Sequence, residues 1–371
     1  MKAAITLLVF CVAGLLSLGM VMLYSSGMAK VGAHYLVMQL LWGAFGLVTC
    51  MVAVSLDYRW LKKFAWVFYV VAIALLALLF LPHLGVRKNG ATRWLGYGGT
   101  SIFQPSEVAK LALLVGLAWY GERYQRQMPT WRRGILVPGV FVGLLLGLIF
   151  IEPDRGTTVL LAGVSAVVLL VAGVRWKYFV PPVIAALAAL GYSLWHDPMR
   201  HKRIFSWLYL EESKSGVGYQ AYQAMLALGA GGWTGLGLGN GRQKMGFVPE
   251  HHTDFIFSII GEELGLIATL LVVLCFVIIV LCGIYIATHA RDTFGLLLAT
   301  GITFLVGLQA FINIGVVTSA LPNKGLPLPF ISYGGSNLLI MLTAVGVLLS
   351  IGRHARVPDS VKPSAQEGEA A

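Results

Sequence analysis

The chain has 371 residues, a formal net charge of +11, 58% hydrophobic residues, 12% charged residues and a mean hydropathy of +0.80. Soluble domains carry about 25% charged residues, so half that share argues against a soluble protein and for a membrane protein. The positive charge is scattered over short loops and forms no basic stripe. It therefore fits membrane orientation and contact with anionic lipid, and we expect no nucleic-acid partner.

Apolar runs of about 17–25 residues, each able to cross about 30 Å of hydrocarbon, recur along the chain. They predict an all-α, polytopic membrane protein with about ten transmembrane helices. The expected spans cover residues 4–24, 34–54, 64–81, 107–121, 135–151, 157–173, 179–195, 262–287, 294–316 and 336–352. The four cysteines lie inside apolar runs without a CxxC pair, so neither a disulfide framework nor a zinc site is indicated.

Lysine and arginine in the short loops set the expected orientation. Basic residues follow spans two, four, six, eight and ten, as at Lys62, Arg132 and Arg175. Because such residues mark the cytoplasmic side, both termini are expected in the cytoplasm, and the large loop at about 196–261, between spans seven and eight, is expected outside. We expect residues 1–357 to form one membrane domain and the small, polar residues 358–371 to form a disordered cytoplasmic tail.

Four polar clusters fall on the outer side of this topology, and the first contains Arg93 and the run from Gln104 to Lys110. A charge at the centre of a membrane helix costs about 2.5–3.5 kcal/mol on insertion scales, so charges beside spans require an explanation. Ser106 is expected as the N-cap of the fourth span, and Glu107 and Lys110 can share one helix face. Two interpretations stay open: a structural ion pair, or a basic site for a phosphorylated ligand built from Arg93 and Lys110.

The second and fourth clusters are irregular segments. Residues 152–158 combine Pro-Asp with Gly-Thr, a pattern that starts helices, so Asp154 is either a cap for the sixth span or a substrate-binding residue. Residues 321–337 contain three closely spaced prolines, which forbid regular helix; such backbone is tolerated at membrane depth only where it lines protein or a polar cavity. Lys324, the only charge in this segment, is a candidate for binding phosphate, and Ser332 is a candidate for contacting substrate.

The third cluster closes the large loop, where two carboxylates and two histidines lie within five residues. The spacing matches no standard metal motif, so a structural metal site is disfavoured. A single carboxylate, Asp254, suits the role of general base on a substrate hydroxyl, with a turn or N-cap carboxylate as the alternative. We expect Glu250 and His252 to support Asp254, and Glu262 and Glu263 to belong to the first turn of the eighth helix.

These motifs together resemble the SEDS family, named for shape, elongation, division and sporulation. The resemblance is carried by Gly-Leu-Pro-Leu-Pro-Phe-Ile-Ser-Tyr-Gly-Gly-Ser at 325–336 with Asn313 before it, by Arg93-Trp94, by Gln104-Pro105-Ser106-Glu107-x-x-Lys110, by Pro153-Asp154-x-Gly156-Thr157 and by Pro249-Glu250-x-His252-Thr253-Asp254-Phe255. It covers all ten spans in order. The motifs at 237–244, 260–265 and 321–326 resemble the division members of the family more than the elongation members.

The resemblance implies a peptidoglycan glycosyltransferase that polymerises lipid II, an undecaprenyl-pyrophosphate-linked disaccharide peptide, outside the bacterial cytoplasmic (inner) membrane. It also implies that Asp254 is the essential acidic residue. The implied partners are a class B penicillin-binding protein transpeptidase, other division proteins and membrane lipid.

The reaction defines what the clusters must supply. An acceptor hydroxyl must lose a proton, which we assign to Asp254, and the leaving pyrophosphate needs positive charge. Arg93, Lys110 and Lys324 are candidates for that charge; a divalent cation, Mg²⁺ or Mn²⁺, is the alternative, and no other cofactor is expected. An α-linked donor and a β-linked product fit one inverting displacement without an enzyme nucleophile.

Three other functions stay open: a lipid II flippase or transporter, an elongation-type polymerase, and a scaffold that docks a synthase. A flippase needs polar residues along a path through the membrane, whereas here the charged clusters lie on the outer side of the predicted topology. This distribution favours the enzyme.

Overall fold

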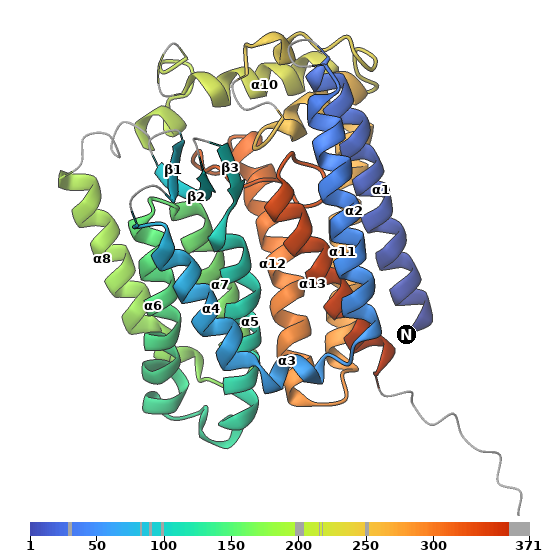
Figure 1. Ribbon diagram of the computed structural model, residues 1–371. Helices are drawn as coiled ribbons and strands as arrows, with labels where there is room; N and C mark the ends of the chain where they lie inside the picture. Colours follow the sequence, from blue (N-terminus) through green and yellow to red (C-terminus); the bar gives the residue numbers. More distant parts are fainter. Residues whose placement is uncertain are drawn as a thin grey trace, which may run out of the picture.

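The computed structural model describes residues 1–28, 32–81, 84–88, 91–97, 100–196, 204–214, 216, 218–248 and 252–355. Long helices run along one common direction, and a small sheet and helix α10 (Tyr219–Gly231) cover one end of them (Figure 1). The expectations for Glu250 and for the tail at 358–371 lie outside the described residues.

A helix coincides with each expected span. The helices are α1 (Lys2–Gly27), α2 (His34–Ser55), α3 (Arg59–Lys63), α4 (Ala65–Leu78), α5 (Pro105–Arg123), α6 (Val137–Ile151), α7 (Arg155–Val171), α8 (Val180–His196), α10, α11 (Ile256–Thr288), α12 (Thr293–Val317) and α13 (Gly335–Arg353), with short 3-10 or π turns at Gln125–Gln127, Arg132–Leu136, Trp176–Phe179 and Gln243–Met245. Helices α1, α2, α6 with its leading turn, α11, α12 and α13 are long and apolar enough to cross a membrane, and α4, α7 and α8 are shorter apolar helices. The all-α membrane architecture is therefore confirmed.

The start of α5 differs from expectation. Pro105 occupies the first helical position and Gln104 the cap position, so the expected N-cap role of Ser106 is wrong. Proline fits the first position because its φ is already helical and its missing N–H would have no partner there.

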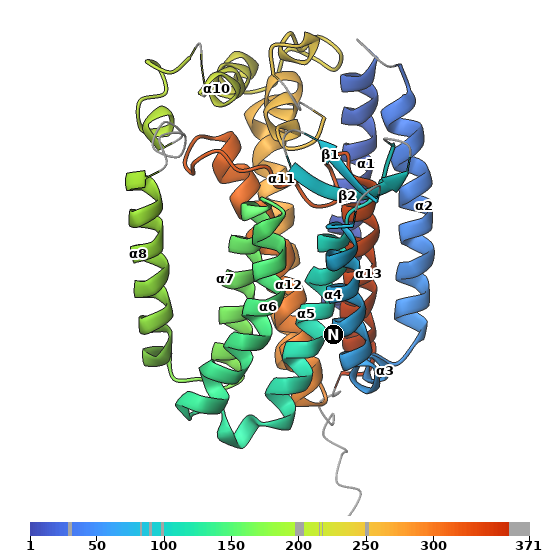
Figure 2. The same ribbon diagram turned by 60° about the vertical axis from the view of Figure 1, so that its left-hand side comes forward.

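A three-stranded antiparallel sheet, which the sequence did not predict, connects α4 to α5. Strands β1 (Gly85–Lys88), β2 (Ala91–Tyr97) and β3 (Thr100–Phe103) lie in the order β1-β2-β3. Their short length hides the alternation that identifies longer strands. Figure 2 shows the sheet beside the upper ends of the helices. Arg93, in β2, bonds to the carbonyl oxygen of Pro153, just before the start of α7.

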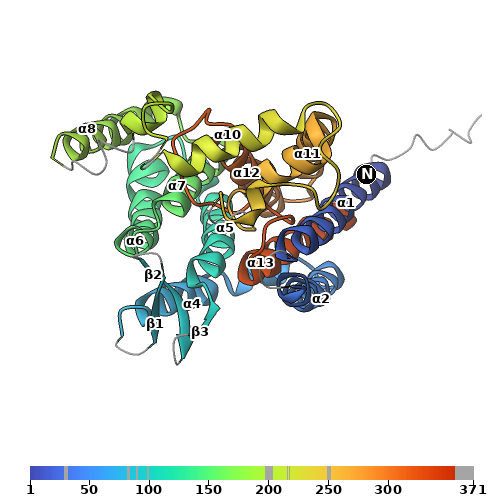
Figure 3. The same ribbon diagram turned by 90° about the horizontal axis from the view of Figure 1, so that it is seen from above.

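Helices α5 and α12 lie in the middle of the bundle, and α8 and α2 lie on opposite sides of it (Figure 3). Outward-facing apolar side chains are exposed on the outer helices, as at Phe45 on α2 and Leu270 on α11. Exposed apolar surface of this extent is expected where helices face lipid rather than water.

The direction of the helices brings the polar clusters together. Helices α5, α7, α11 and α13 all begin at the end that carries the sheet and α10 (Figure 1). The start of α1 and the end of α13 lie at the opposite end, where the Ile5 side chain is 3.2 Å from the Cβ position of Gly352.

Helix α11 begins earlier than the expected eighth span and is interrupted at Gly265, where φ is +77°. Glu262 and Glu263 consequently lie in the second turn, so their expected position in the first turn is wrong. A φ in this range is open to glycine at little cost, which explains how the helix can break at Gly265 and then continue.

Candidate active site

The Glu107–Lys110 pair is buried between three helices. Lys110 Nζ donates to the two carboxylate oxygens of Glu107 at 2.8 and 2.9 Å and to Gln309 Oε1 at 3.1 Å. Asn337 Nδ2 donates to Glu107 Oε2 at 2.9 Å. A charge pair is tolerated in such surroundings because each member is both paired and hydrogen-bonded. The pair therefore links α5 to α12 and α13, and its two charges neutralise each other.

Gln104 joins the first cluster to the second and the fourth. Its backbone N–H donates to Ser336 Oγ at 3.2 Å, and its Nε2 donates to Asp154 Oδ2 at 3.4 Å. Asp154 Oδ1 accepts from the backbone N–H of Thr157 at 3.2 Å, so Asp154 caps α7. Asp154 is buried, and its carboxylate holds the start of α7 against the start of α5.

Arg93 extends from the sheet to the same place. Its Nη2 donates to the carbonyl oxygen of Pro153, and its Nε is buried and bonds to none of the described residues. The guanidinium thus lies beside the turn that separates α6 from α7, with an N–H group available for a further acceptor.

Asp254 lies just before α11 and faces the proline-rich segment at 321–334. A Cβ atom added at Gly325 would lie 2.6 Å from Asp254 Oδ2. Asn313 Nδ2, on α12, donates to the carbonyl oxygens of Asp254 at 2.7 Å and of Leu326 at 2.6 Å. Phe255, not Asp254, occupies the cap position of α11, so of the two alternative roles the N-cap is wrong, and Asp254 lies in the turn before the helix.

An aromatic group surrounds His252. The rings of His252 and Tyr35 are stacked with centroids 4.3 Å apart, and Tyr333 is tilted against both. The backbone N–H of Tyr333 also donates to the carbonyl oxygen of His252 at 2.9 Å. These contacts fix the backbone two residues before Asp254.

Ser332 ties the proline-rich segment to the end of the large loop. Its Oγ donates to the carbonyl oxygen of Thr253 at 2.6 Å and accepts from the backbone N–H of Leu328 at 2.7 Å. Gln39 Nε2, on α2, donates to the Ser332 carbonyl oxygen at 3.0 Å. Ser332 therefore acts within the protein as a brace that positions the residue next to Asp254.

The three expected cations have different surroundings. Lys110 is buried and neutralised by Glu107, whereas Arg93 and Lys324 are partly exposed. Lys324 directly precedes Gly325, which contacts Asp254. The starts of α5, α7, α11 and α13 add partial positive charge at the same end, since the first N–H groups of a helix point outward from it.

Glu152 belongs to the second cluster, but the sequence did not single it out as a site residue. It lies in the turn after α6, outside the spanning helices, and is 2% exposed. Burial raises the pKa of its carboxyl to about 8; the Asp154 carboxylate raises it further and the Arg93 guanidinium lowers it. A strongly perturbed carboxyl beside two expected site residues is itself a signal of function.

A further group of polar residues, separate from the four clusters, holds the glycine-rich strap (residues 231–245) against the break in α11. The sequence analysis did not identify this group. Glu263 Oε1 accepts from Lys244 Nζ at 2.6 Å, and both Glu263 oxygens accept from Ser25 Oγ, at 2.9 and 2.7 Å. Glu262 Oε1 accepts from the backbone N–H groups of Arg242 and Gln243 at 2.7 and 3.2 Å. These two carboxylates thus fasten the strap to α11 and α1.

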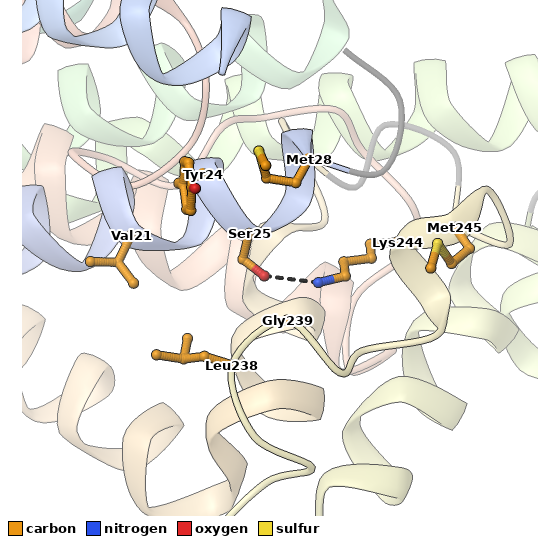
Figure 4. Close-up of a pocket in the computed structure, with 8 residues that line it drawn as sticks. All are labelled: Val21, Tyr24, Ser25, Met28, Leu238, Gly239, Lys244 and Met245. Atoms are coloured by element: carbon orange, nitrogen blue, oxygen red, sulfur yellow. Dashed lines mark hydrogen bonds between the residues drawn. The ribbon is translucent and has the colours of Figure 1, made fainter. Parts of the chain in front are cut away.

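A cavity of about 470 Å³ lies between the strap and the end of α1. Its lining residues are Val21, Tyr24, Ser25, Met28, Leu238, Gly239, Lys244 and Met245. Figure 4 shows the bond between Ser25 and Lys244, which is the polar part of a mostly apolar lining. None of the eight described site residues lines this cavity, so we place the chemistry at the junction of the four clusters.

The amides Gln39, Gln309 and Asn337 were also missed. Gln39 and Gln309 lie inside apolar runs and Asn337 at the start of one; a polar side chain there needs a partner, and that requirement is the signal that could have found them. Within the described residues, no group of three or more His, Cys, Asp or Glu side chains is arranged to hold a metal ion.

The structure brings together eight of the nine expected site residues at one end of the bundle, and Glu250 lies outside the described residues. Arg93, Asp154, Glu107 and Lys110 are connected through Gln104 and the start of α5. The other half of the site consists of His252, Asp254, Lys324 and Ser332. Gln309 links the two halves, because it donates to Pro327 O of the proline-rich segment at 2.8 Å and also binds Lys110.

Comparison with known proteins places this geometry in context. The model of the cell cycle protein family FtsW, RodA and SpoVE matches residues 5–357. The probable peptidoglycan glycosyltransferase FtsW of Geobacter metallireducens is 39% identical over 344 residues, covering 91% of this chain and 92% of that protein. Stage V sporulation protein E of Bacillus subtilis is 39% identical over 361 residues, covering 94% and 97%.

Solved structures agree with the sequence relatives. A chain from a peptidoglycan synthase complex, described as coordinating polymerization and crosslinking, matches with a TM-score of 0.79 at 27% identity, covering 93% of this chain and 96% of that one. The rod shape determining protein RodA of Thermus thermophilus matches with a TM-score of 0.69 at 27% identity, covering 95% and 97%.

Proposed function

The chain belongs to the FtsW, RodA and SpoVE family of cell cycle proteins, and on this basis we propose that it is a peptidoglycan glycosyltransferase that polymerises lipid II. The observation that carries the proposal is the junction of the four polar clusters, which hydrogen bonds join at one end of the bundle. An enzyme that acts on a lipid-linked substrate needs its charges where the lipid headgroup lies.

Asp254 is the proposed general base. It takes the proton of an acceptor sugar hydroxyl as that oxygen attacks the anomeric carbon of the donor, in one inverting displacement. The braces at Ser332, Asn313 and Tyr333 support this role because they fix the backbone at residues 252–254. A general base must be held within hydrogen-bond distance of the hydroxyl proton that it removes, so the reaction requires a rigid backbone at Asp254.

The leaving pyrophosphate is proposed to bind near Arg93 and Lys324. Both are partly exposed and lie at the end where α5, α7, α11 and α13 begin, so positive charge is already in place where negative charge develops. Lys110 is proposed to act through Glu107 and Gln309, as part of the frame.

We further propose that the sheet and α10 lie outside the cytoplasmic membrane, with both termini in the cytoplasm. The start of α1 and the end of α13 share one end, and the short loops at that end carry more basic residues than the short loops at the other end, as the positive-inside rule requires.

A class B penicillin-binding protein transpeptidase is the proposed partner, and septal wall synthesis the proposed role. The similarity to a chain of a synthase complex that combines polymerization with crosslinking supports the partner, and the relatives named FtsW support the division role.

The test is purified protein in detergent with lipid II, with polymer length read on a gel. We expect glycan strands from the wild type and none from Asp254→Asn, since loss of a general base costs about 10²–10⁴-fold. Glu122→Gln, which removes a carboxylate near the opposite end of the bundle, is the matched control and should remain active. Polymer from Asp254→Asn at the wild-type rate would refute the base role.

The same assay distinguishes a polymerase from a flippase and tests for a divalent ion. Flipping needs a bilayer whereas polymerisation does not, so a wild type that is inactive in detergent with and without its partner would favour a flippase. Chelation with EDTA, followed by Mg²⁺ or Mn²⁺, shows whether a divalent ion shares the pyrophosphate charge with Arg93 and Lys324.

A further inference from the structure

Glu152 is buried, and its carboxyl group is not hydrogen-bonded within the part of the chain that the structure describes. Neither of its carboxyl oxygens forms a hydrogen bond with any described residue, although the side chain is only 2% exposed. Leaving one partner of a buried hydrogen bond unsatisfied costs about 1–3 kcal/mol. Such a group next to functional residues leaves two polar atoms that a ligand or an ordered water can pair with.

The surroundings of Glu152 favour its neutral form. The charged groups that act on it are Arg93 from β2 and Asp154 at the start of α7. On α5, the charges of Glu107 and Lys110 neutralise each other. The carboxyl also lies at the end of α6, where the last carbonyl groups carry partial negative charge.

Burial and the Asp154 carboxylate outweigh the Arg93 guanidinium, which is why the pKa of Glu152 rises to about 8. At neutral pH most of the population therefore carries the proton, and a protonated carboxyl is a hydrogen-bond donor. A carboxylic acid kept neutral by its surroundings can donate to an anion at pH 7.

A second unused donor lies next to this acid. Arg93 Nε is buried and has no hydrogen-bond partner within the described part of the chain, and the same guanidinium binds the carbonyl oxygen of the residue that follows Glu152. Two donors, one of them cationic, need a ligand rich in acceptor oxygens and negative charge. A diphosphate has both properties, whereas a sugar hydroxyl or an amide offers only single acceptors without charge.

We propose that Glu152, as a neutral acid, donates a hydrogen bond to a phosphate oxygen of the lipid-linked diphosphate, beside the Arg93 guanidinium. The inference rests on the proposed function for the choice of substrate. Its consequence is that anion binding and proton retention support each other: the bound diphosphate disfavours the Glu152 carboxylate, and the carboxylate repels the diphosphate.

The test measures binding of undecaprenyl diphosphate to the purified full-length protein in detergent between pH 7 and 9. For the wild type we expect the Kd to rise about tenfold over this range, because one proton is lost above a pKa near 8. Glu152→Gln keeps a neutral donor of similar shape, so its Kd should resemble that of the wild type at pH 7 and change less than about twofold up to pH 9. Ionisation of the diphosphate itself cancels, since both proteins are titrated with the same probe.

Glu152→Ala removes the donor and should weaken binding about tenfold at pH 7, as expected for one hydrogen bond to a charged group. The inference is overturned if the wild type shows no pH dependence, if Glu152→Gln follows the wild type, or if Glu152→Gln is as weak as Glu152→Ala at pH 7. Thermal unfolding of each variant, with a midpoint near that of the wild type, establishes that the fold is intact.

The outcomes also separate this inference from the proposed function. Lipid II polymerisation without pH-linked diphosphate binding overturns the role of Glu152 alone. Absence of polymerisation in every condition overturns the glycosyltransferase, while the binding series still decides whether Glu152 contacts the diphosphate.

Discussion

Gly325 lies directly against the carboxylate of Asp254, so that a Cβ atom at Gly325 would be 2.6 Å from Asp254 Oδ2. The two residues are brought together by Asn313, which binds the backbone of Asp254 and of Leu326 at once. The proline-rich segment, rather than α11 alone, therefore determines where the carboxylate can point.

Gly325→Ala should lower the polymerisation rate about 10²-fold with little loss of stability. The added methyl group would meet the end of a flexible side chain, so the fold can accommodate it by turning Asp254 away. A displacement of about 1 Å at a reacting group can cost this much. Gly147→Ala in α6, where a Cβ would meet nothing within 4 Å, is the matched control. Wild-type rates in Gly325→Ala would show that the carboxylate position is not limiting.

Lys110→Met should destabilise the protein by about 3–5 kcal/mol, because it leaves the Glu107 carboxylate buried without its partner charge. The double variant Glu107→Gln, Lys110→Met removes both charges and should recover most of that loss. Unfolding midpoints in detergent measure the difference. A double variant no more stable than Lys110→Met would contradict this account.

The activity of the same double variant decides between the two interpretations left open for this pair. Recovered lipid II polymerisation assigns Lys110 to the frame of the protein. A folded, inactive double variant assigns it to substrate.

Hydropathy and helix-start patterns predicted most of the architecture, because a helix that crosses lipid must be apolar along its own length. The turn chemistry around Asp154 and the three prolines before Ser332 likewise pointed to irregular backbone that gathers at one end. The sequence left open whether Lys110 forms a structural ion pair or binds a phosphorylated ligand, since its environment depends on Gln309 and Asn337, far along the chain.

The missed features share one physical cause, which is dependence on long-range contacts. The sheet forms from strands that are too short to show an alternating pattern. The break at Gly265 depends on the strap, which bonds to α11 on both sides of it. Leu236 N–H donates to Glu262 O at 2.9 Å, and Leu266 N–H donates to Gly232 O at 2.9 Å. Glu152 was hidden for the same reason, since its burial and its neighbour Arg93 come from different parts of the chain.

Gly231→Ala should loosen the strap. A Cβ at Gly231 would collide with the carbonyl oxygen of Gly261, and backbone cannot move aside as a side chain does. We expect a lower unfolding midpoint and faster trypsin cleavage at Arg242. Gly229→Ala, two residues earlier in the same helix and with nothing within 4 Å, should leave both unchanged. Equal cleavage rates in the two variants would contradict the close packing of strap and α11.

The raised pKa of Glu152 should also appear in the pH dependence of stability. The folded protein holds this proton with a pKa of about 8, against an ordinary value of 4.5, so the folded state binds more protons than the unfolded state between these values. The stability that comes from this difference is fully present below about pH 4.5, declines as pH rises, and is lost once pH passes about 8.

Glu152→Gln cannot titrate and isolates this effect from all other groups. The unfolding midpoint of the wild type minus that of Glu152→Gln, measured in detergent from pH 5 to 9, should fall steadily with rising pH and become constant above about pH 8. A difference that stays constant across the range would mean that Glu152 is ionised at neutral pH in the folded protein. In that case it could not donate a hydrogen bond to an anion, and the pH-linked diphosphate binding expected for the wild type should be absent as well.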